Sequence, residues 1–283
     1  MDDATLQEAV NLTSELATNK DRSGPLPFWE LGLKQSCGKV LPKNNSLLQN
    51  QIQTIKDLSD RREMALNTDK TCLFIVNFTL KHQFRPLLEI PGCDNLMDRV
   101  LETKLLGFWF THDMKVNRHV EHLLGICYKR LWAIPKLKKA CISDDDILHF
   151  YFMKIRSVLE TNCPVFHCML TQDNTNDIER IQKIVLRVIL DDKYTDYHNA
   201  CLQLNVQNLQ VRRTKLSLNF ALKCVESEKF SHLFKHKTNT CIRDPDKFDV
   251  SFARTTRYMN SPRLYLTCLL NSFFRNEKYF EAN

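Results

Sequence analysis

The sequence predicts an α+β protein that is mainly helical, with a few strands in its first part and helices in the remainder. Apolar residues recur at helical spacing in nearly every segment after residue 115. Before that point, segments 71–78 and 104–111 are rich in β-branched and aromatic residues, as strands are. Only 6 of the 283 residues are glycine, which argues against an all-β fold with many tight turns.

The first third of the chain is predicted to mix helix, loop and strand. Residues 20–45 are rich in Pro, Gly, Asn and Lys, so we expect an exposed loop or insertion there. The other elements are each indicated by an apolar face or by strand composition. They are helices over 4–17 and 46–62, strands over 71–78 and 104–111, and a short strand over 84–91.

Amphipathic helices account for most of the remaining sequence. Val120 to Leu131 has an apolar stripe that includes Tyr128, and Pro135 is expected to end or kink this helix. The segment from Ser143 to Asp146 has the pattern of a helix start. The expected helices that follow cover 143–159, 176–190 and 206–228, and a polar connector covers 238–262.

Basic residues are concentrated after residue 60. Residues 1–60 carry six Lys and Arg against eight Asp and Glu, whereas the remainder carries 34 against 25. The densest stretch, 115–139, has seven basic residues and a single acidic one, Glu121. Such a stripe is typical of a protein that binds a nucleic-acid backbone, and the ordinary alternative is a solvated helix face.

Several classes of site lack their sequence signatures. The chain contains neither GxxxxGK[ST] nor GxGxxG, and its 11 cysteines form no C-x2-C pair, which argues against a structural zinc site. Cys163 and Cys168 are predicted to be small buried apolar residues. His119 and His122 are predicted to be solvated or to face phosphate.

We expect an intracellular protein, nuclear or cytoplasmic, that is not secreted and has no membrane partner. No apolar run reaches the ~18 residues that a membrane span requires. The first 20 residues are polar and acidic, unlike a signal peptide.

The tandem acids Asp2 and Asp3 admit two interpretations. Clustered carboxylates hold the divalent ions of two-metal phosphoryl transfer, and Mg²⁺ prefers such oxygen ligands. Acidic residues also favour the first turn of an ordinary helix. The motifs that follow along the chain favour the first interpretation.

In their order, these motifs resemble the C-terminal half of a reverse transcriptase of a non-LTR (LINE-type, jockey-like) retrotransposon, over roughly the whole chain. Met1-Asp2-Asp3 is similar to the end of the family's aromatic-x-Asp-Asp motif, and Met64 to Thr71 to its LNxxKT segment. Residues 105–108 resemble the primer-grip hairpin. The thumb-like matches are His119-Val120 with Arg130-Leu131, Tyr151 to Glu160, Pro164 to His167, Ile178 to Lys183, Arg212-Arg213, and Arg257 to Pro262.

Two departures from the family concern the first part of the chain. The 20–45 segment is longer than the usual spacer between the Asp pair and LNxxKT. The tryptophan that usually precedes LNxxKT is replaced by Leu58-Ser59-Asp60. The expected geometry of residues 20–62 is therefore the least determined by the resemblance.

The resemblance implies a partial palm over 1–112, with a few antiparallel strands and the 20–45 loop insertion. It also implies a helical thumb and connection over 113–237, and a polar connector and tail over 238–283. It also implies a role for particular residues. Each role has an ordinary alternative: Lys70 could be a surface lysine, Gly107 could form a strand bulge, and the basic residues could be solvated. Asp2, supported by Asp3, would bind Mg²⁺ or Mn²⁺, and Lys70 would stabilise charge on the triphosphate or donate a proton to the leaving group. Leu105, Leu106, Gly107 and Phe108 would position the primer; Lys115, Arg118, Lys129 and Arg130 would follow the phosphates of the duplex.

The implied partners are an RNA template paired with a DNA primer, and dNTP. In the family, the first metal-binding Asp and the nucleotide-binding residues lie upstream of the Asp pair. We therefore expect the isolated chain to be catalytically incomplete as an RNA-directed DNA polymerase. Two alternatives stay open: a non-catalytic nucleic-acid-binding remnant, and a helical protein-interaction remnant.

Overall fold

The computed structural model describes residues 45–64, 67, 71–76, 98–237 and 246–275. The predicted helix over 4–17, the loop over 20–45 and the strand over 84–91 lie outside these residues. The chain divides into two compact units, Met1–Thr103 and Lys104–Asn283, and each is described by itself. In the described part, helix predominates and strands are few and short, so the prediction of a mainly helical α+β protein is confirmed at that level.

The first unit contains helix α3 (Asn45–Arg61), as predicted for 46–62. The helix ends in a Schellman motif, in which Glu63 adopts a positive φ of 53° and the Met64 amide donates to the Ser59 carbonyl at 3.0 Å. The Ser59 hydroxyl donates to the Met64 carbonyl at 2.5 Å, which further fixes this end.

Two short strands of the first unit, β1 (Cys72–Phe74) and β2 (Asp98–Val100), pair in parallel with Cys72 opposite Asp98. The expectation that the palm strands would be antiparallel is wrong for this pair. More than twenty residues connect the two strands, which is long enough for the chain to return and run in the same direction.

The second unit is built from helices that follow one hairpin. The hairpin consists of β3 (Glu102–Leu105), which begins at the end of the first unit, and β4 (Phe108–Thr111). The α-helices are α4 (Asn117–Leu131), α5 (Ala133–Lys139), α6 (Asp144–Tyr151), α7 (Ser157–Glu160), α8 (Cys163–Phe166), α9 (Gln172–Leu190), α10 (Tyr197–Gln203), α11 (Leu209–Glu226), α12 (Thr256–Met259) and α13 (Pro262–Arg275). The other turns are π-helical η2 (Phe152–Arg156) and the 3-10 turns η3 (His167–Met169), η4 (Asp191–Lys193) and η5 (Ser231–Leu233).

The helix starts follow the local sequence. The Ser143 hydroxyl accepts from the Asp146 amide at 3.2 Å, so α6 begins where the sequence predicted. Thr171 and Asn208 cap α9 and α11 in the same way, at 3.2 and 2.7 Å. Pro135 does not kink α4: the helix ends at Leu131, and Pro135 lies in the first turn of α5, where its missing N–H is tolerated.

Residues 256–259 and 262–275 are helical, although the sequence indicated a polar connector up to 262 and a tail beyond it. α13 begins at Pro262 and buries Leu264, Leu266 and Leu270. Its Asn271 side chain accepts from the Phe248 amide and donates to the Phe248 carbonyl, both at 2.9 Å. This paired contact satisfies the backbone of the preceding segment.

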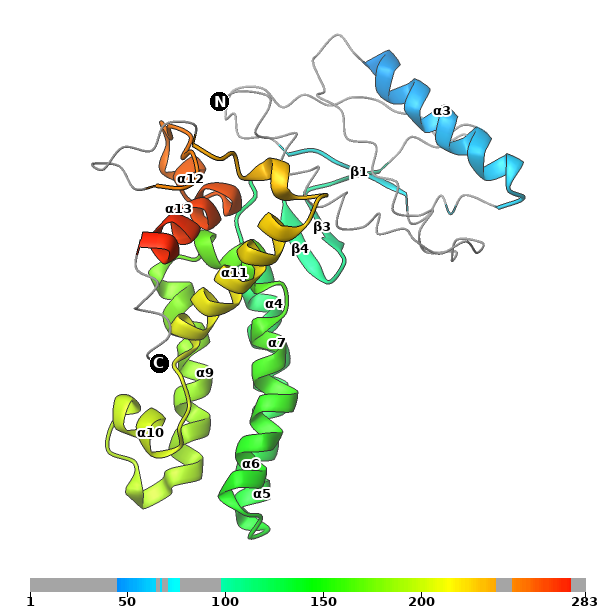
Figure 1. Cartoon of the computed structure of the whole chain (residues 1–283). Helices are drawn as coiled ribbons and strands as arrows, with labels where there is room; N and C mark the ends of the chain where they lie inside the picture. The colour runs from blue at the N-terminus through cyan, green and yellow to red at the C-terminus, as the bar shows by residue number, and fades with distance from the viewer. Residues whose placement is uncertain (1–44, 65–66, 68–70, 77–97, 238–245, 276–283) are drawn as a thin grey trace. The chain divides into compact units, whose positions relative to one another are not determined.

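The core of the second unit lies between α4, α9 and the continuous α6–η2–α7 segment, which lie side by side in Figure 1. Fully buried aliphatic side chains from these three segments, such as Val120, Ile155 and Val185, fill it. Cys163 is also fully buried, as predicted, and Cys168 is partly exposed. α11 crosses this layer and packs on α8, α9 and α13.

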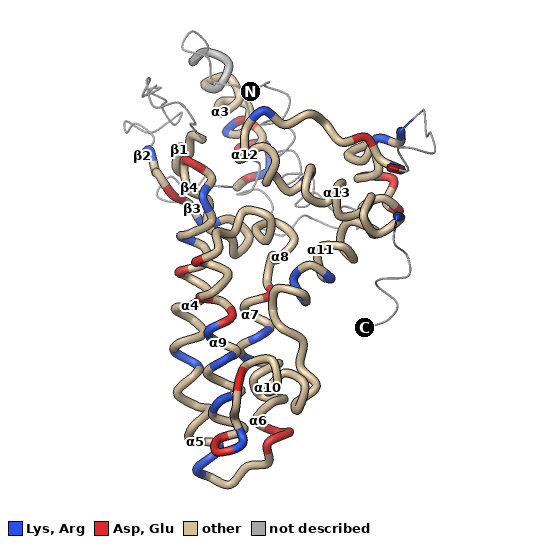
Figure 2. The backbone as a smooth tube through the Cα atoms, turned by 90° about the vertical axis from the view of Figure 1, so that its left-hand side faces the viewer, with Lys and Arg blue, Asp and Glu red and all other residues tan. Residues whose placement is uncertain are grey.

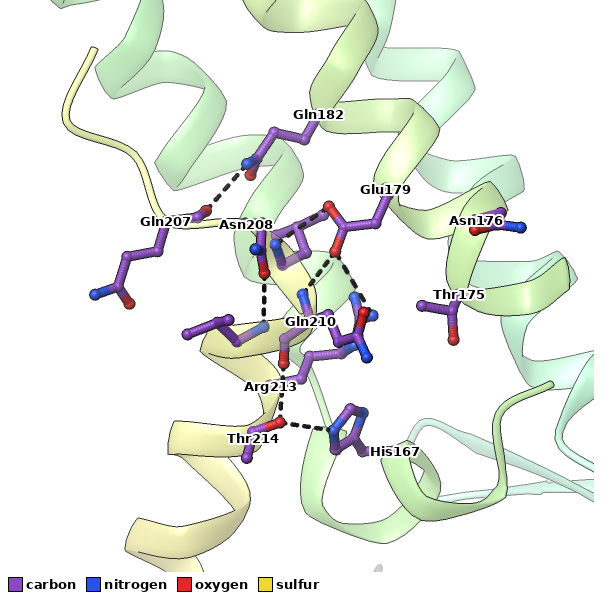
Figure 3. Close-up of polar contacts among 12 residues, drawn as sticks. His167, Thr175, Asn176, Glu179, Gln182, Gln207, Asn208, Gln210, Arg213 and Thr214 are labelled. Atoms are coloured by element: carbon purple, nitrogen blue, oxygen red, sulfur yellow. Dashed lines mark hydrogen bonds and ion pairs between the residues drawn. The ribbon is translucent and has the colours of Figure 1, made fainter. Parts of the chain in front are cut away.

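A buried carboxylate joins α9 to α11 (Figure 3). Glu179, on α9, accepts hydrogen bonds from the backbone amides of Leu209 and Gln210 at 3.2 and 2.6 Å, at the start of α11. It also accepts from the Tyr197 hydroxyl at 2.5 Å and lies 3.9 Å from the guanidinium of Arg213, which is 1% exposed. The helix dipole and the cation therefore both stabilise this buried negative charge.

Gln182 extends the network one turn further along α9. Its carbonyl accepts from the Tyr151 hydroxyl at 2.7 Å, and its amide donates to the Tyr197 hydroxyl and to the Gln207 carbonyl, both at 3.0 Å. Because burial disfavours the phenolate, the pKa of Tyr151 is well above its ordinary value. The Gln182 side chain on α9 is thus hydrogen-bonded to both α6 and α10.

We expect Glu179→Gln to lower the free energy of unfolding by roughly 3–5 kcal/mol, because it leaves the Arg213 guanidinium buried without a counter-charge. Urea denaturation measures the change. The double variant with Arg213→Met should recover part of the loss, whereas Glu226→Gln, at the exposed end of α11, serves as the control. Additive effects of the two substitutions would contradict the pairing.

Candidate nucleic-acid interface

The structure describes eight of the eleven residues for which the sequence predicted a functional role. Asp2, Asp3 and Lys70 lie outside the described residues. Residues 105–108 form the tip of the β3–β4 hairpin, and the predicted phosphate-binding residues Lys115, Arg118, Lys129 and Arg130 lie just before or on α4. The two groups are therefore consecutive in the second unit.

The hairpin turn consists of two residues, Leu106 and Gly107, both with positive φ (49° and 83°). Positive φ at both positions is the signature of a type I′ turn, whose twist matches that of paired strands. The alternative of a strand bulge at Gly107 is thus wrong. Leucine rarely adopts this conformation, yet Leu106 is 55% exposed, so little packing offsets the strain.

The hairpin is anchored on the helices behind it. Phe108 is buried, and its ring centroid lies 4.2 Å from that of His119 on α4, which in turn lies 5.1 Å from that of Phe166 on α8. Asn162, itself at a positive φ of 58°, places its amide 3.5 Å from the Leu106 carbonyl. The tip is held while its outer side remains exposed.

His119 is fully buried, so the prediction that it is solvated or faces phosphate is wrong. It lies among aromatic rings on the inner face of α4, and within the described structure neither ring nitrogen has a hydrogen-bond partner. Burial lowers the pKa of His119 to about 4, with further contributions from the nearby His122 and Lys104. His119 is thus a neutral core residue.

The opposite face of α4 is exposed and carries cations and aromatic rings. Successive residues of a helix are rotated by 100° about its axis, so the residues on the side opposite the buried His119, Val120, Leu123 and Cys127 can be identified. We call these outward residues the α4 face: Arg118, Glu121, His122, Gly125, Tyr128, Lys129 and Trp132. Tyr128 is 47% exposed, so its predicted place in the apolar stripe is wrong.

A cation lies over an indole ring near each end of the α4 face. Near the hairpin, the Arg118 guanidinium is 4.7 Å from the ring centroid of Trp109. At the other end, the Lys136 ammonium is 4.1 Å from the ring centroid of Trp132. Between them, a Cβ added to Gly125 would meet nothing within 4 Å. The face is therefore open at Gly125.

The four predicted basic residues differ in how far their charge is already matched. Lys115 lies 2.9 Å from Asp113, and Arg118 lies 3.8 Å from Glu121. Partial burial opposes ionisation of Asp113, but hydrogen bonds from Lys115 and Thr111 lower the pKa of this carboxyl to about 2. The positive charge of Lys115 is thus partly offset by the ionised Asp113 at neutral pH.

Lys129 and Arg130 are both exposed, and neither forms an ion pair with a carboxylate in the described part of the chain. The Arg130 guanidinium donates to the Lys154 carbonyl, which orients its side chain. Further basic residues continue beyond this pair: Lys136 and Lys139 on α5, and Arg180, Lys183 and Arg187 on α9, are all exposed. Figure 2 shows Lys and Arg recurring along α4 and α9.

The aromatic residues of this surface were not predicted as functional. Trp109 was assigned to a strand and Tyr128 to the core, and Trp132 was not singled out. For Trp132, the basic residues three and four positions away, Lys129 and Lys136, are the sequence signal that could have revealed it. Only the structure shows that Tyr128 and Trp132 are exposed, whereas Trp109 is half-buried.

Among the described residues, no group of three or more His, Cys, Asp or Glu side chains could hold a metal ion. The predicted Mg²⁺ ligands lie outside this set. No helix found in the described ranges is long and apolar enough to cross a membrane.

Comparisons of the sequence with protein-family models, with curated proteins and with solved structures find no match. The function is therefore inferred from the residues and their arrangement.

We expect His119→Phe to reduce the dependence of stability on pH. Between about pH 6.5 and 4, the unfolded chain binds a proton at this histidine that the folded protein does not, so stability rises with pH over this window. One such group contributes up to about 1.4 kcal/mol per pH unit. Thermal or urea unfolding across the window measures the difference.

The exposed His149→Phe is the matched control and should leave the pH profile unchanged. If His119→Phe keeps the wild-type slope between pH 4 and 6.5, the assignment of a buried neutral imidazole is incorrect.

We expect Leu106→Asn to stabilise the second unit by about 1 kcal/mol, because Asn-Gly suits a type I′ turn far better than Leu-Gly does. The melting temperature reports the gain. Leu101→Asn, at a residue that is 58% exposed and does not have a positive φ, should give no gain. A loss of stability at Leu106 would show that its side chain is a packing residue.

Proposed function

We propose that the chain is part of a reverse transcriptase domain of the non-LTR type, and that its second unit holds a template–primer duplex by the sugar-phosphate backbone. The observation that carries this proposal is the exposed α4 face, which continues from the I′ turn of the hairpin and carries cations over aromatic rings at both ends. The order of motifs along the sequence supports the same family.

The chemistry of this surface suits phosphates. Lys129 on the α4 face and Lys136 just beyond it are exposed cations, and Arg130, outside this face, is exposed as well. Glu121 is the single acidic residue between 115 and 139. Cations on solvated side chains bind the polyanionic backbone by releasing its counterions, without reading sequence. A polymerase must move along any sequence, so this kind of contact fits the proposed role.

The hairpin tip is suited to contact the end of one nucleic-acid strand. Gly107 has no side chain, and Leu106 projects beside it from a rigid turn anchored by Phe108 and Asn162. A backbone that is open on one side can approach the sugar of a primer terminus closely. In this proposal, the tip positions the primer and α4 follows the phosphates behind it.

Nucleotide addition is not assigned to the described residues. In the family, Mg²⁺ or Mn²⁺ bound by carboxylates supplies the charge stabilisation for nucleotidyl transfer. Asp2, Asp3 and Lys70, with which the resemblance associates this chemistry and the dNTP, lie outside the described part of the chain. The proposal for the second unit is therefore binding of the duplex.

We expect binding of a fluorescent 20-base-pair RNA–DNA hybrid to weaken steeply with salt, and the double variant Lys129→Ala with Arg130→Gln to weaken it equally for unrelated sequences. Glutamine removes the charge of Arg130 but keeps an N–H donor at the position that contacts the Lys154 carbonyl. The slope of log K against log salt should fall by about 2. Fluorescence anisotropy measures both quantities.

The matched control is Lys223→Ala with Lys235→Gln, which removes two exposed cations elsewhere in the second unit. Binding that is insensitive to salt and to the α4 variant would reject the proposal and favour a helical protein-interaction role.

A further inference from the structure

The end of the α4 face far from the hairpin carries two exposed aromatic side chains. Trp132 is 61% exposed and Tyr128 is 47% exposed, one helical turn apart on the same side of α4. Trp132 lies fourteen residues from Arg118, which corresponds to about 21 Å along a helix. This pair is therefore well separated from the primer-positioning tip.

These side chains do not stabilise the fold by burial. A tryptophan gains most of its stabilising effect when its ring leaves water, and here most of the residue remains in contact with solvent. Lys136, 4.1 Å from the ring centroid, covers one face of the Trp132 indole. The other face of the indole ring is left for stacking with a planar group of a ligand.

We propose that Trp132 and Tyr128 form a stacking platform for unpaired bases of an RNA strand, a second contact of the same helix beyond the duplex. The inference rests on the proposed function, which supplies RNA as the template. Stacking on aromatic side chains suits any base, because every base has a π-face. In a duplex those faces are covered by neighbouring pairs, so the platform selects unpaired nucleotides.

Charge complementarity favours a polyanion over an apolar partner. Lys129, next to Tyr128, and Lys136 and Lys139, on α5, are exposed and lie on or just beyond this end of α4. The ammonium groups of Lys129 and Lys139 are available to phosphates on either side of a stacked base, while Lys136 stays over the indole. A groove with cations and interleaved aromatic rings is the usual design of single-strand binding surfaces.

The test compares oligo(rU) of twelve nucleotides with the RNA–DNA hybrid. We expect Trp132→Leu with Tyr128→Leu to weaken oligo(rU) binding roughly tenfold, with no change in its salt slope and a clearly smaller loss of hybrid affinity. Trp132→Phe alone should retain most of the affinity but lose the quenching of tryptophan fluorescence that accompanies binding. Circular dichroism confirms that each variant is folded.

Phe252→Leu is the matched control, because Phe252 is an exposed aromatic residue (84%) outside the α4 face. Unchanged oligo(rU) affinity in the double leucine variant, or an equal loss for the hybrid, would overturn the platform. The outcome is separable from the proposed function: loss of hybrid binding in the Lys129 and Arg130 variant tests duplex binding, whereas the leucine variant tests stacking with all charges kept.

Discussion

The arrangement of the second unit depends on one buried negative charge. Glu179 lies inside the protein, where an ionised carboxylate is stable only if hydrogen bonds and an opposite charge surround it. Those partners come from separate segments: the first amides of α11, the Tyr197 hydroxyl of α10 and the Arg213 guanidinium. Satisfying the carboxylate therefore fixes the relative positions of α9, α10 and α11.

That constraint determines which side of α4 can meet a ligand. α9, held by Glu179 and Gln182, packs along α4 and covers its apolar stripe, while the hairpin covers His119 through Phe108. In the part of the chain that the structure describes, the side of α4 that carries Tyr128, Lys129 and Trp132 is left outward. The position of the proposed interface is thus a consequence of how the core is closed, since a different packing of α9 would bury other α4 residues.

The sequence predicted the features that local chemistry decides. Ser143 caps α6, and an apolar stripe marks α9, because capping and periodicity involve residues close together in the chain. The sequence-based prediction failed where burial or strand pairing depends on contacts between segments that are far apart in the chain. His119 looks polar but is enclosed by Phe108 and Phe166, and Tyr128 fits the stripe but lies beyond the edge covered by α9. The parallel pairing of β1 with β2 likewise depends on the long connection between them.

For the candidate site, too, the sequence predicted some features and missed others. The motif order located the hairpin and the basic residues of α4, but not the exposed rings. Leu106 adopts a strained backbone conformation with half its surface in water, and Trp132 leaves most of its ring unburied. Neither feature improves the stability of the fold, and both lie on the surface where cations cluster. Departures from local rules without a compensating gain in packing are characteristic of residues that serve a ligand. Since both departures occur on the hairpin and helix that the basic charge already marks, the proposed role in holding nucleic acid would account for strain, exposure and charge together.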